Sequence, residues 1–384
     1  MKNNRLHIVC FDIPYPADYG GVMDIFYKVK ALHEAGKVIT LHCFQYRERT
    51  PQAELEKYCA KVYYYSRSFS PLKMLSLKPF IVQSRNNYKL LKNLKSDNAP
   101  ILFEGLHSCA FIHKNALKDR QKLVRMHNTE WEYYRNLTQS EPRFLKKLYL
   151  KLESWKLRRF EKQILPYPDA ILTISPDDTD YFSEMIENEG LTKTQVVYVA
   201  PFHPNTAVES RTGTGNYVLF HGKLSVSDNE EAAIYLIDRI FSKQEIPLSI
   251  AGKNPTERLL EKARPYEHIK IIPNPDEAKM TDLIQNAQIN VLLSFQRSGM
   301  KLKLLNALYR GRHCVVNRHM VQNTGLESLC YVKNTSKDIR ATVESLMNVQ
   351  FSIRQIAERR EILEQQFSNK GNAAKIVAVL NNRS

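Results

Sequence analysis

The sequence predicts an α/β protein made of two doubly wound domains. Short apolar runs rich in β-branched residues recur along the chain, as at residues 6–11, 38–44 and 289–294, and helical patterns alternate with them. Strands and helices that alternate in this way form parallel sheets with helices on both faces. A chain of 384 residues is also longer than one ordinary core requires, which favours two domains.

The domain boundaries follow from a change in composition near the middle of the chain. Residues 201–216 form a polar segment with glycine and proline, which we interpret as an inter-domain linker. The first domain then comprises residues 1–200 and the second comprises residues 217–352. Residues 353–384 are helical in pattern.

The composition indicates a globular, cytoplasmic protein with an anionic partner. Apolar residues make up 43% of the chain, but no run approaches the length of a membrane-spanning helix, and the first residues lead directly into a strand. The formal net charge of +16 favours nucleotide phosphates, a phospholipid surface or a nucleic acid as a partner. The six cysteines lack metal-binding spacing, so we expect reduced core residues and no zinc site.

The first strand, residues 6–11, leads into a loop that closes with two glycines. Gly20 and Gly21 lie beyond the carboxyl end of this strand and directly before a helix predicted at residues 22–35. Because glycine has no Cβ, the backbone here can approach a diphosphate at the amino end of the helix. A tight turn without a ligand is the alternative for this pair.

Two later strands of the first domain end in side chains that suit a binding site. The strand at residues 101–105 ends with Glu104, and the strand at residues 122–127 ends with His127. Ligands of doubly wound folds lie at the carboxyl ends of the strands. Glu104 is therefore either an acceptor contact or a structural carboxylate, and His127 is either a cleft residue or a packed one.

Residues 143–163 form a basic amphipathic helix. Eight lysines or arginines and two glutamates are interleaved with leucines and aromatic residues. Three interpretations stay open: a domain helix with one face in the core, the same helix also touching an anionic membrane, and a stripe that binds nucleic acid. No motif that combines arginines and aromatic residues for nucleic-acid binding accompanies it.

The strongest motif of the sequence lies at residues 298–311 of the second domain. A loop after the strand at residues 289–294 contains Gly299, and the helix that follows carries Lys301 and Lys303 at its start. Free backbone N–H groups, the positive end of the helix dipole and two ammonium groups suit a phosphate. A pair of solvated lysines at a helix start is the alternative.

This motif resembles the signature of retaining GT-B glycosyltransferases of family 4, of the glycosyl transferase group 1 type, in the subgroup with the pattern Gly-x-Lys-x-Lys-x-x-Glu-Ala-x-x-x-Gly. Residues 11–21 are similar to the family's proline-rich loop that ends in Gly-Gly. Residues 122–130 are similar to its strand ending in His-Asn-x-Glu, and residues 217–224 to its strand ending in Gly-Arg/Lys-Leu. The resemblance implies the GT-B fold, in which two Rossmann-like domains face a central cleft and residues 353–384 pack back on the first domain.

The resemblance also implies roles for individual residues. The implied catalytic residues are His127, Lys223 and Lys301. The implied donor-binding residues are Gly20, Gly21, Gly222, Lys223, Ser298, Gly299, Met300, Lys301, Lys303 and Asn306. The implied acceptor-binding residues are Tyr19 and Glu104.

The sequence departs from the family pattern at two positions. Asn306 stands where the family has the glutamate that grips the ribose, and Ser298 stands where it has another glutamate eight residues earlier. An asparagine still hydrogen-bonds a diol, but without charge assistance. The alternative to an active transferase is therefore a degenerate GT-B protein that binds a nucleotide sugar or serves as a scaffold.

The function that the resemblance implies is retaining transfer of a sugar from a nucleotide-diphosphate donor, such as a UDP- or GDP-sugar, to an acceptor hydroxyl in bacterial-type cell-surface glycan or polysaccharide synthesis. We expect a glycan or lipid-linked acceptor, and contact with an anionic membrane at the inner face of the cytoplasmic membrane rather than with nucleic acid. Because lysines supply the positive charge and no Asp-x-Asp motif is present, we expect neither a metal nor another cofactor.

Overall fold

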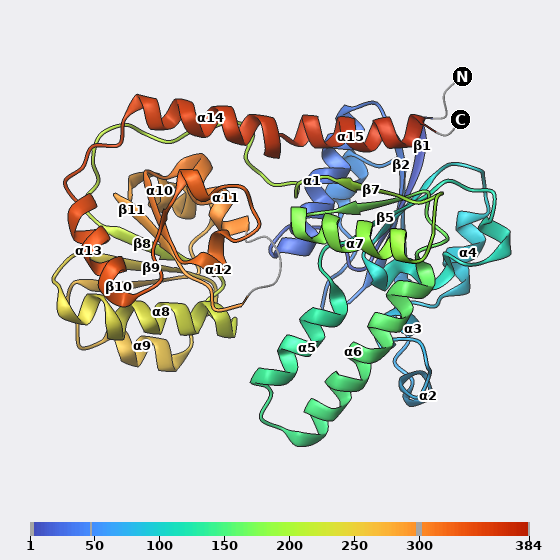
Figure 1. Ribbon diagram of the computed structural model, residues 1–384, viewed down its shortest axis with the longest axis horizontal. Helices are drawn as coiled ribbons and strands as arrows, with labels where there is room; N and C mark the ends of the chain where they lie inside the picture. The colour runs from blue at the N-terminus through green and yellow to red at the C-terminus, as the bar shows by residue number, and fades with distance from the viewer. Residues whose placement is uncertain (1–3, 47, 297–301, 383–384) are drawn as a thin grey trace. The chain divides into compact units, whose positions relative to one another are not determined.

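The computed structural model describes residues 4–46, 48–296 and 302–382. The chain divides into two compact units (Figure 1). The first unit contains the residues up to Pro204 together with those from Phe367 onward, and the second contains Asn205–Gln366. The division after Pro204 falls inside the segment 201–216 that the sequence predicts as a linker.

The first unit is built on a parallel sheet. Its strands, within the described residues, have the order β3-β2-β1-β4-β5-β6-β7, and every pairing between neighbours is parallel. The strands are β1 Arg5–Cys10, β2 Val38–Gln45, β3 Lys61–Ser66, β4 Ile101–Glu104, β5 Lys122–Arg125, β6 Ala170–Thr173 and β7 Gln195–Tyr198. The inner strands are apolar along their length because helices cover both faces of the sheet.

Helices of the first unit pack on both faces of this sheet. One face is covered by α1 and α15, and the other by α3, α4, α6 and α7, as their apolar residues in the two core clusters show. The helices are α1 Gly20–Glu34, α2 Pro71–Met74, α3 Phe80–Gln83, α4 Tyr88–Leu94, α5 Glu130–Ser140, α6 Phe144–Ile164, α7 Pro176–Asn188 and α15 Asn369–Asn381, with the 3₁₀ turns η1 Ala53–Lys57, η2 Leu106–Phe111 and η3 Asn115–Leu117.

Helix α1 begins two residues earlier than the sequence predicts. Gly20 and Gly21 form its first turn rather than a loop before it. Tyr19 caps the helix without a side-chain hydrogen bond, so the cap leaves the amino end of α1 to other partners. The helix ends before Gly36, whose φ of +82° is a conformation that other residues rarely adopt.

The second unit repeats this plan. The strand order is β10-β9-β8-β11-β12-β13 within the described residues, again with parallel pairings. The strands are β8 Val218–His221, β9 Leu248–Gly252, β10 Ile269–Pro273, β11 Ile289–Leu292, β12 His313–Val316 and β13 Tyr331–Val332. The helices are α8 Ser227–Arg239, α9 Glu257–Ala263, α10 Glu277–Asn286, α11 Leu302–Arg310, α12 Arg318–Val321, α13 Ser336–Leu346 and α14 Ile353–Phe367, with the 3₁₀ turns η4 Phe241–Lys243 and η5 Glu327–Leu329.

Each sheet has one point at which the strand order reverses. In the first unit the reversal lies between β1 and β4, and in the second it lies between β8 and β11. Open parallel sheets bind ligands outside the carboxyl ends of the strands at such a point. The search for a functional site therefore begins at these two edges.

The C-terminal helices divide between the units at a different place from the predicted boundary at residue 353. Helix α14 belongs to the second unit almost to its end, and only α15 belongs to the first, where it packs against α1. The reason is the buried guanidinium of Arg359, which donates hydrogen bonds to the carbonyls of Leu308, Gly311 and Arg312. These bonds join α14 to the segment that connects α11 with β12.

None of the helices among the described residues is both long enough and apolar enough to cross a membrane.

We predict that Arg359→Ala destabilises the second unit by about 3 kcal/mol, because it leaves several buried carbonyls without a donor. Arg354→Ala is the matched control on the same helix. Its side chain is exposed and pairs with Glu358 on the surface, so its loss should change the free energy of unfolding by about 0.5 kcal/mol or less. Urea unfolding of both variants measures the difference, and equal effects would contradict an anchoring role for Arg359.

Candidate functional site

The reversal point of the first sheet gathers charged side chains from three successive elements. Asp24 and Lys28 lie on α1, which follows β1. Glu104 is the last residue of β4, and His127 follows Arg125 at the end of β5. All five side chains are buried, and their hydrogen bonds form one continuous network.

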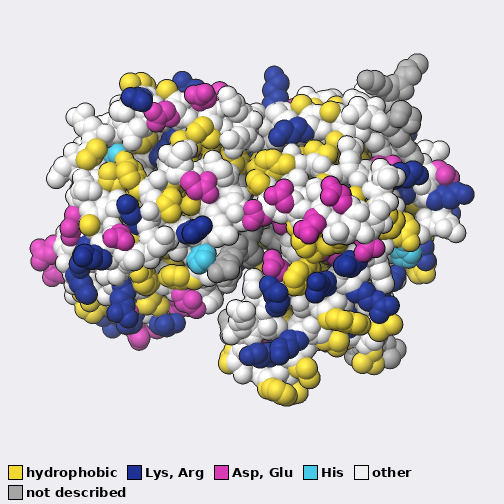
Figure 2. Space-filling view, viewed as in Figure 1, with side chains coloured by type: hydrophobic (Ala, Val, Ile, Leu, Met, Phe, Trp, Pro, Cys, Tyr) yellow, Lys and Arg dark blue, Asp and Glu magenta, His cyan; other side chains and the backbone are white. Residues whose placement is uncertain are grey.

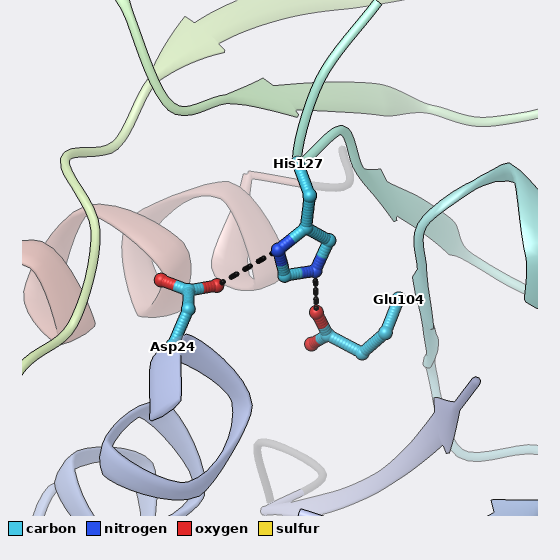
Figure 3. A group of neighbouring side chains, drawn as sticks. All are labelled: Asp24, Glu104 and His127. Carbon is cyan, nitrogen blue, oxygen red and sulfur yellow. Dashed lines mark hydrogen bonds and ion pairs between the residues drawn. The ribbon is translucent and has the colours of Figure 1, made fainter. Parts of the chain in front are cut away.

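The imidazole of His127 is held between two carboxylates (Figure 3). Its Nε2 lies 2.9 Å from Oε2 of Glu104, and its Nδ1 lies 3.7 Å from Oδ2 of Asp24. The residue is only 8% exposed. The two carboxylates therefore fix the orientation of the ring from opposite sides.

Two buried cations balance these carboxylates. Lys28 Nζ donates to Oδ2 of Asp24 at 2.8 Å and to Oε2 of Glu104 at 2.9 Å. Arg125 donates to both carboxylate oxygens of Asp24. Burial by itself would raise the pKa of Asp24, but Arg125 and Lys28 outweigh it and hold this pKa below its ordinary value.

The trio of Asp24, Glu104 and His127 brings possible metal-ligand atoms within 4.8 Å of one another. Lys28 donates to an oxygen of each carboxylate, and a divalent cation would have to displace that ammonium group. The two carboxylates are already balanced by two buried cations, so the charges of this cluster do not favour a metal.

The predicted acceptor residues differ in accessibility. Glu104 is fully buried, which fits the structural role that the sequence left open and offers no exposed atom to an acceptor. Tyr19 is 39% exposed, and its hydroxyl donates to Oδ2 of Asp12 at 2.7 Å. Acceptor contact by these residues stays a prediction, and Tyr19 has the more suitable position.

Gly21 has a steric reason to be glycine. A Cβ added there would lie 2.9 Å from the ring of Phe11, closer than real contacts allow. The first turn of α1 therefore lies directly against the residue that follows β1. The backbone of Gly20 and Gly21 forms the amino end of the helix, where an anion is favoured.

In the second unit, Asn229 joins the two predicted lysine positions. The residue lies in the first turn of α8, and its Nδ2 donates to the carbonyl of Lys223 at 3.0 Å. Its Oδ1 accepts a hydrogen bond from Nζ of Lys303 at 2.7 Å. Lys303 Nζ also lies 3.4 Å from the carbonyl of Leu293 and 5.1 Å from the ring centre of Phe220. The structure thus brings Lys303 beside the loop that carries Lys223.

The loop after β8 is confined by its neighbours. A Cβ at Gly222 would lie 3.1 Å from the amide of Asn229, and a Cβ at Gly252 would lie 1.7 Å from the carbonyl oxygen of Gly222. The side chain of Lys223, in contrast, is exposed. This geometry keeps the backbone fixed while the ammonium group of Lys223 reaches solvent.

Asp228 holds the segment that leads into the phosphate-binding motif. Its carboxylate accepts hydrogen bonds from Ser294 Oγ and from the backbone N–H of Phe295, each at 2.7 Å. The predicted residues Ser298, Gly299, Met300 and Lys301 follow and lie outside the described residues.

The predicted ribose contact, Asn306, lies on α11 and is partly buried. Its Oδ1 accepts a hydrogen bond from Nδ2 of Asn205 at 2.9 Å. In this structure the side chain of Asn306 is thus engaged within the second unit.

Sequence reasoning missed His221, which ends β8 immediately before Gly222. The side chain is 4% exposed, and its Nε2 has no hydrogen-bond partner among the described residues. Burial, assisted by the positive charge of Lys303, lowers the pKa of His221 to about 3. The imidazole is therefore neutral at physiological pH, and its place before the Gly-Lys pair is the one sequence signal that pointed to it.

Comparisons with known proteins agree with this architecture. Residues 215–348 match the family described as glycosyl transferases group 1. A protein described as an uncharacterized 44.6 kDa protein in the cps region of Klebsiella pneumoniae is 28% identical over 324 residues, covering 79% of this chain and 80% of the relative.

Solved glycosyltransferase structures share the fold over nearly the whole chain. TarM of S. aureus, in complex with fondaparinux, α-GlcNAc-glycerol and UDP, has a TM-score of 0.68 at 9% identity and covers 100% of both chains. HepE of Anabaena, in complex with UDP and glucose, has a TM-score of 0.63 at 10% identity and covers 98% of this chain and 99% of HepE.

The prediction of two parallel-sheet α/β domains with the GT-B fold is therefore confirmed. In the sequence of its second domain the chain is of the group 1 glycosyltransferase type, and in the fold of both domains it is GT-B.

Proposed function

We propose that the protein is a retaining glycosyltransferase of family 4 that transfers a sugar from a nucleotide-diphosphate donor to an acceptor hydroxyl in capsule or related cell-surface polysaccharide synthesis. The observation that carries the proposal is the position of Lys303. Its ammonium group lies at the reversal point of the sheet in the domain that matches group 1 glycosyltransferases. That edge is where this class of sheet binds ligands.

Lys303 and Lys223 stabilise the leaving diphosphate in this proposal. Asn229 fixes both through its amide, which accepts from the ammonium group of Lys303 and donates to the backbone of Lys223. A positive charge that is held in place before the reaction stabilises developing negative charge without reorganisation. The predicted Lys301 and the loop before it would add a second cation and free N–H groups.

His127 contacts the donor sugar near the reacting carbon in this proposal, as the family resemblance implies. Glu104 orients the imidazole by its 2.9 Å hydrogen bond, and Lys28 fixes Glu104 in turn. Glu104 therefore acts as a positioning residue. A chain of buried, paired groups holds one orientation better than a solvated side chain does.

Retention without a covalent intermediate fits the carboxylates of the first unit. Asp24 and Glu104 are both buried and ion-paired with Lys28, which makes them poor nucleophiles. We therefore favour transfer on the same face of the sugar, with lysines rather than a metal neutralising the diphosphate.

The polysaccharide class and the donor rest on similarity. The relative from Klebsiella pneumoniae is described by its place in a cps region, and the HepE and TarM structures contain UDP. We therefore propose a UDP-sugar before a GDP-sugar, and a glycan or lipid-linked acceptor reached from the cytoplasmic side of the membrane.

A second candidate function is nucleotide-sugar binding without turnover. The observation that favours it is Asn306, which replaces the glutamate of the family pattern and shares its Oδ1 with Asn205. Slow or absent release of UDP, together with measurable UDP binding, would select this alternative.

We predict that UDP raises the midpoint of thermal unfolding more than GDP does, and that EDTA does not abolish the shift. Lys303→Ala should weaken UDP binding about 10- to 100-fold, the range expected for one charge-assisted hydrogen bond. Lys270→Ala is the control, because Lys270 is an exposed residue of β10 in the same domain. Unchanged affinity of the Lys303 variant would remove this lysine from the donor site.

We predict that His127→Ala and Glu104→Gln lower the rate of UDP release from UDP-glucose or UDP-N-acetylglucosamine about 10- to 100-fold, with little change in UDP affinity. The reason is that both changes disturb the imidazole and leave the second domain intact.

Glu161→Gln is the matched control for Glu104→Gln. Glu161 is an equally buried glutamate of α6, and burial raises its pKa to about 8, so a neutral amide is a close substitute at neutral pH. Its rate of UDP release should stay near that of the unmodified protein. An equal loss of rate and of UDP affinity in the His127 variant would point to folding rather than catalysis.

A further inference from the structure

Helix α6 has two apolar faces, and only one of them is covered. Leu150, Leu157, Phe160 and Ile164 face the core of the first unit and are buried. A second apolar face is largely exposed, and its residues repeat with the same three- and four-residue spacing. These residues are Phe144 (76% exposed), Leu145 (79%), Leu148 (56%), Leu152 (48%) and Trp155 (51%).

The charges beside the exposed face all have one sign. Lys147, Lys151, Arg158 and Arg159 lie on α6 around it. The acidic residues of this helix are Glu153 and Glu161, and both are 0% exposed. Along its whole length α6 therefore presents apolar and basic groups to solvent, but no carboxylate.

The neighbouring segment at residues 69–77 extends the apolar area. Phe69, Leu75 and Leu77 are exposed. The segment is attached to α6, because Lys156 Nζ donates to the carbonyl of Met74 at 2.8 Å. Figure 2 shows hydrophobic and basic side chains next to each other over the hairpin formed by α5 and α6.

A groove of about 260 Å³ lies between α5 and α6 on the same hairpin. It is lined by Trp131, Arg135, Lys151, Ser154, Trp155 and Arg158. The guanidinium groups of Arg135 and Arg158 lie 4.9 and 5.0 Å from the ring centre of Trp131. Both tryptophans of the chain line this groove. Tryptophan rings with adjacent cations suit the boundary between lipid chains and phosphate groups.

We propose that the exposed face of α6, the 69–77 segment and this groove form a membrane-docking surface for an anionic phospholipid bilayer. Leucine and phenylalanine side chains enter the acyl boundary, the lysines and arginines bind lipid phosphates, and the groove accepts one headgroup. This proposal deepens the location given under the proposed function and rests on it for its biological sense. Vesicle binding needs no sugar donor, so its failure is separable from failure of the transfer reaction.

Charge decides between a bilayer and a second copy of the chain. In a two-fold symmetric dimer the same surface would face itself and place the basic side chains of both copies together. An anionic bilayer instead supplies the opposite charge across the whole surface. The lipid surface is therefore the occupant that the described residues favour.

We predict that the full chain sediments with vesicles of phosphatidylcholine that contain phosphatidylglycerol, not with phosphatidylcholine alone, and that high salt releases it. Lys147→Gln with Lys151→Gln should weaken binding about 30-fold, which corresponds to about 1 kcal/mol for each lysine near the surface. Leu145→Ser with Leu148→Ser should weaken it at least about tenfold. Ile353→Ser, at an exposed isoleucine of the second unit, is the apolar control and Lys270→Gln is the charge control.

Tryptophan fluorescence locates the contact. In the Trp131→Phe variant, Trp155 is the one remaining tryptophan. Phosphatidylglycerol vesicles should shift its emission to shorter wavelength, and brominated acyl chains should quench it. Absence of sedimentation, or sedimentation unchanged in both double variants, would overturn the proposal. So would a dimer in solution that the leucine variant abolishes, because the surface would then belong to a second copy. Circular dichroism and thermal unfolding confirm that each variant is folded.

Discussion

The first domain depends on a buried network of charges centred on Asp24. Its carboxylate accepts hydrogen bonds from Lys28, from Arg125 and from the backbone of Phe202, so α1, β5 and the segment after β7 meet at one point. Arg125 also donates to carbonyls at the ends of β6 and β7. Buried charges are costly unless they are paired and fully hydrogen-bonded, and here the pairing ties the helix to the sheet. The same network orients His127, so fold and candidate site share one set of interactions.

The second domain solves the same problem with fewer charges. Asp228, in the helix that follows the first strand of this sheet, binds the end of β11 in the way that Asp24 binds its neighbours. The adjacent Asn229 has both a donor and an acceptor, and one amide can therefore hold a backbone carbonyl and the ammonium group of Lys303 together. A neutral amide fixes the position of Lys303 without neutralising its charge. A carboxylate at this position would compete with a diphosphate for the lysine.

Local patterns were sufficient for the strands, the order of elements and the phosphate-binding motif, because each depends on neighbouring residues. They failed where a residue's environment depends on distant partners. Lys28 looks like a solvated residue of an amphipathic helix, yet it is fully buried by its bond to Glu104, 76 positions away. The motif likewise indicated Lys303, but its partner Asn229 lies 74 positions earlier. The boundary near residue 353 was misplaced for a similar reason, since Arg359 binds carbonyls about 50 residues back in the chain.

Helix α6 shows why its sequence left several interpretations open. Its apolar residues form two stripes with the same helical spacing, and periodicity alone does not say which stripe enters the core. The two glutamates decide the matter only when their partners are known. Glu153 accepts from Lys156 and from the backbone of Phe80, and Glu161 accepts from Tyr181, so both carboxylates lie on the covered side. With every acid of the helix used in internal contacts, the basic residues dominate the opposite side. The net positive charge of the chain thus becomes local at α6, beside apolar side chains, and this combination separates a membrane-docking surface from an ordinary solvated face.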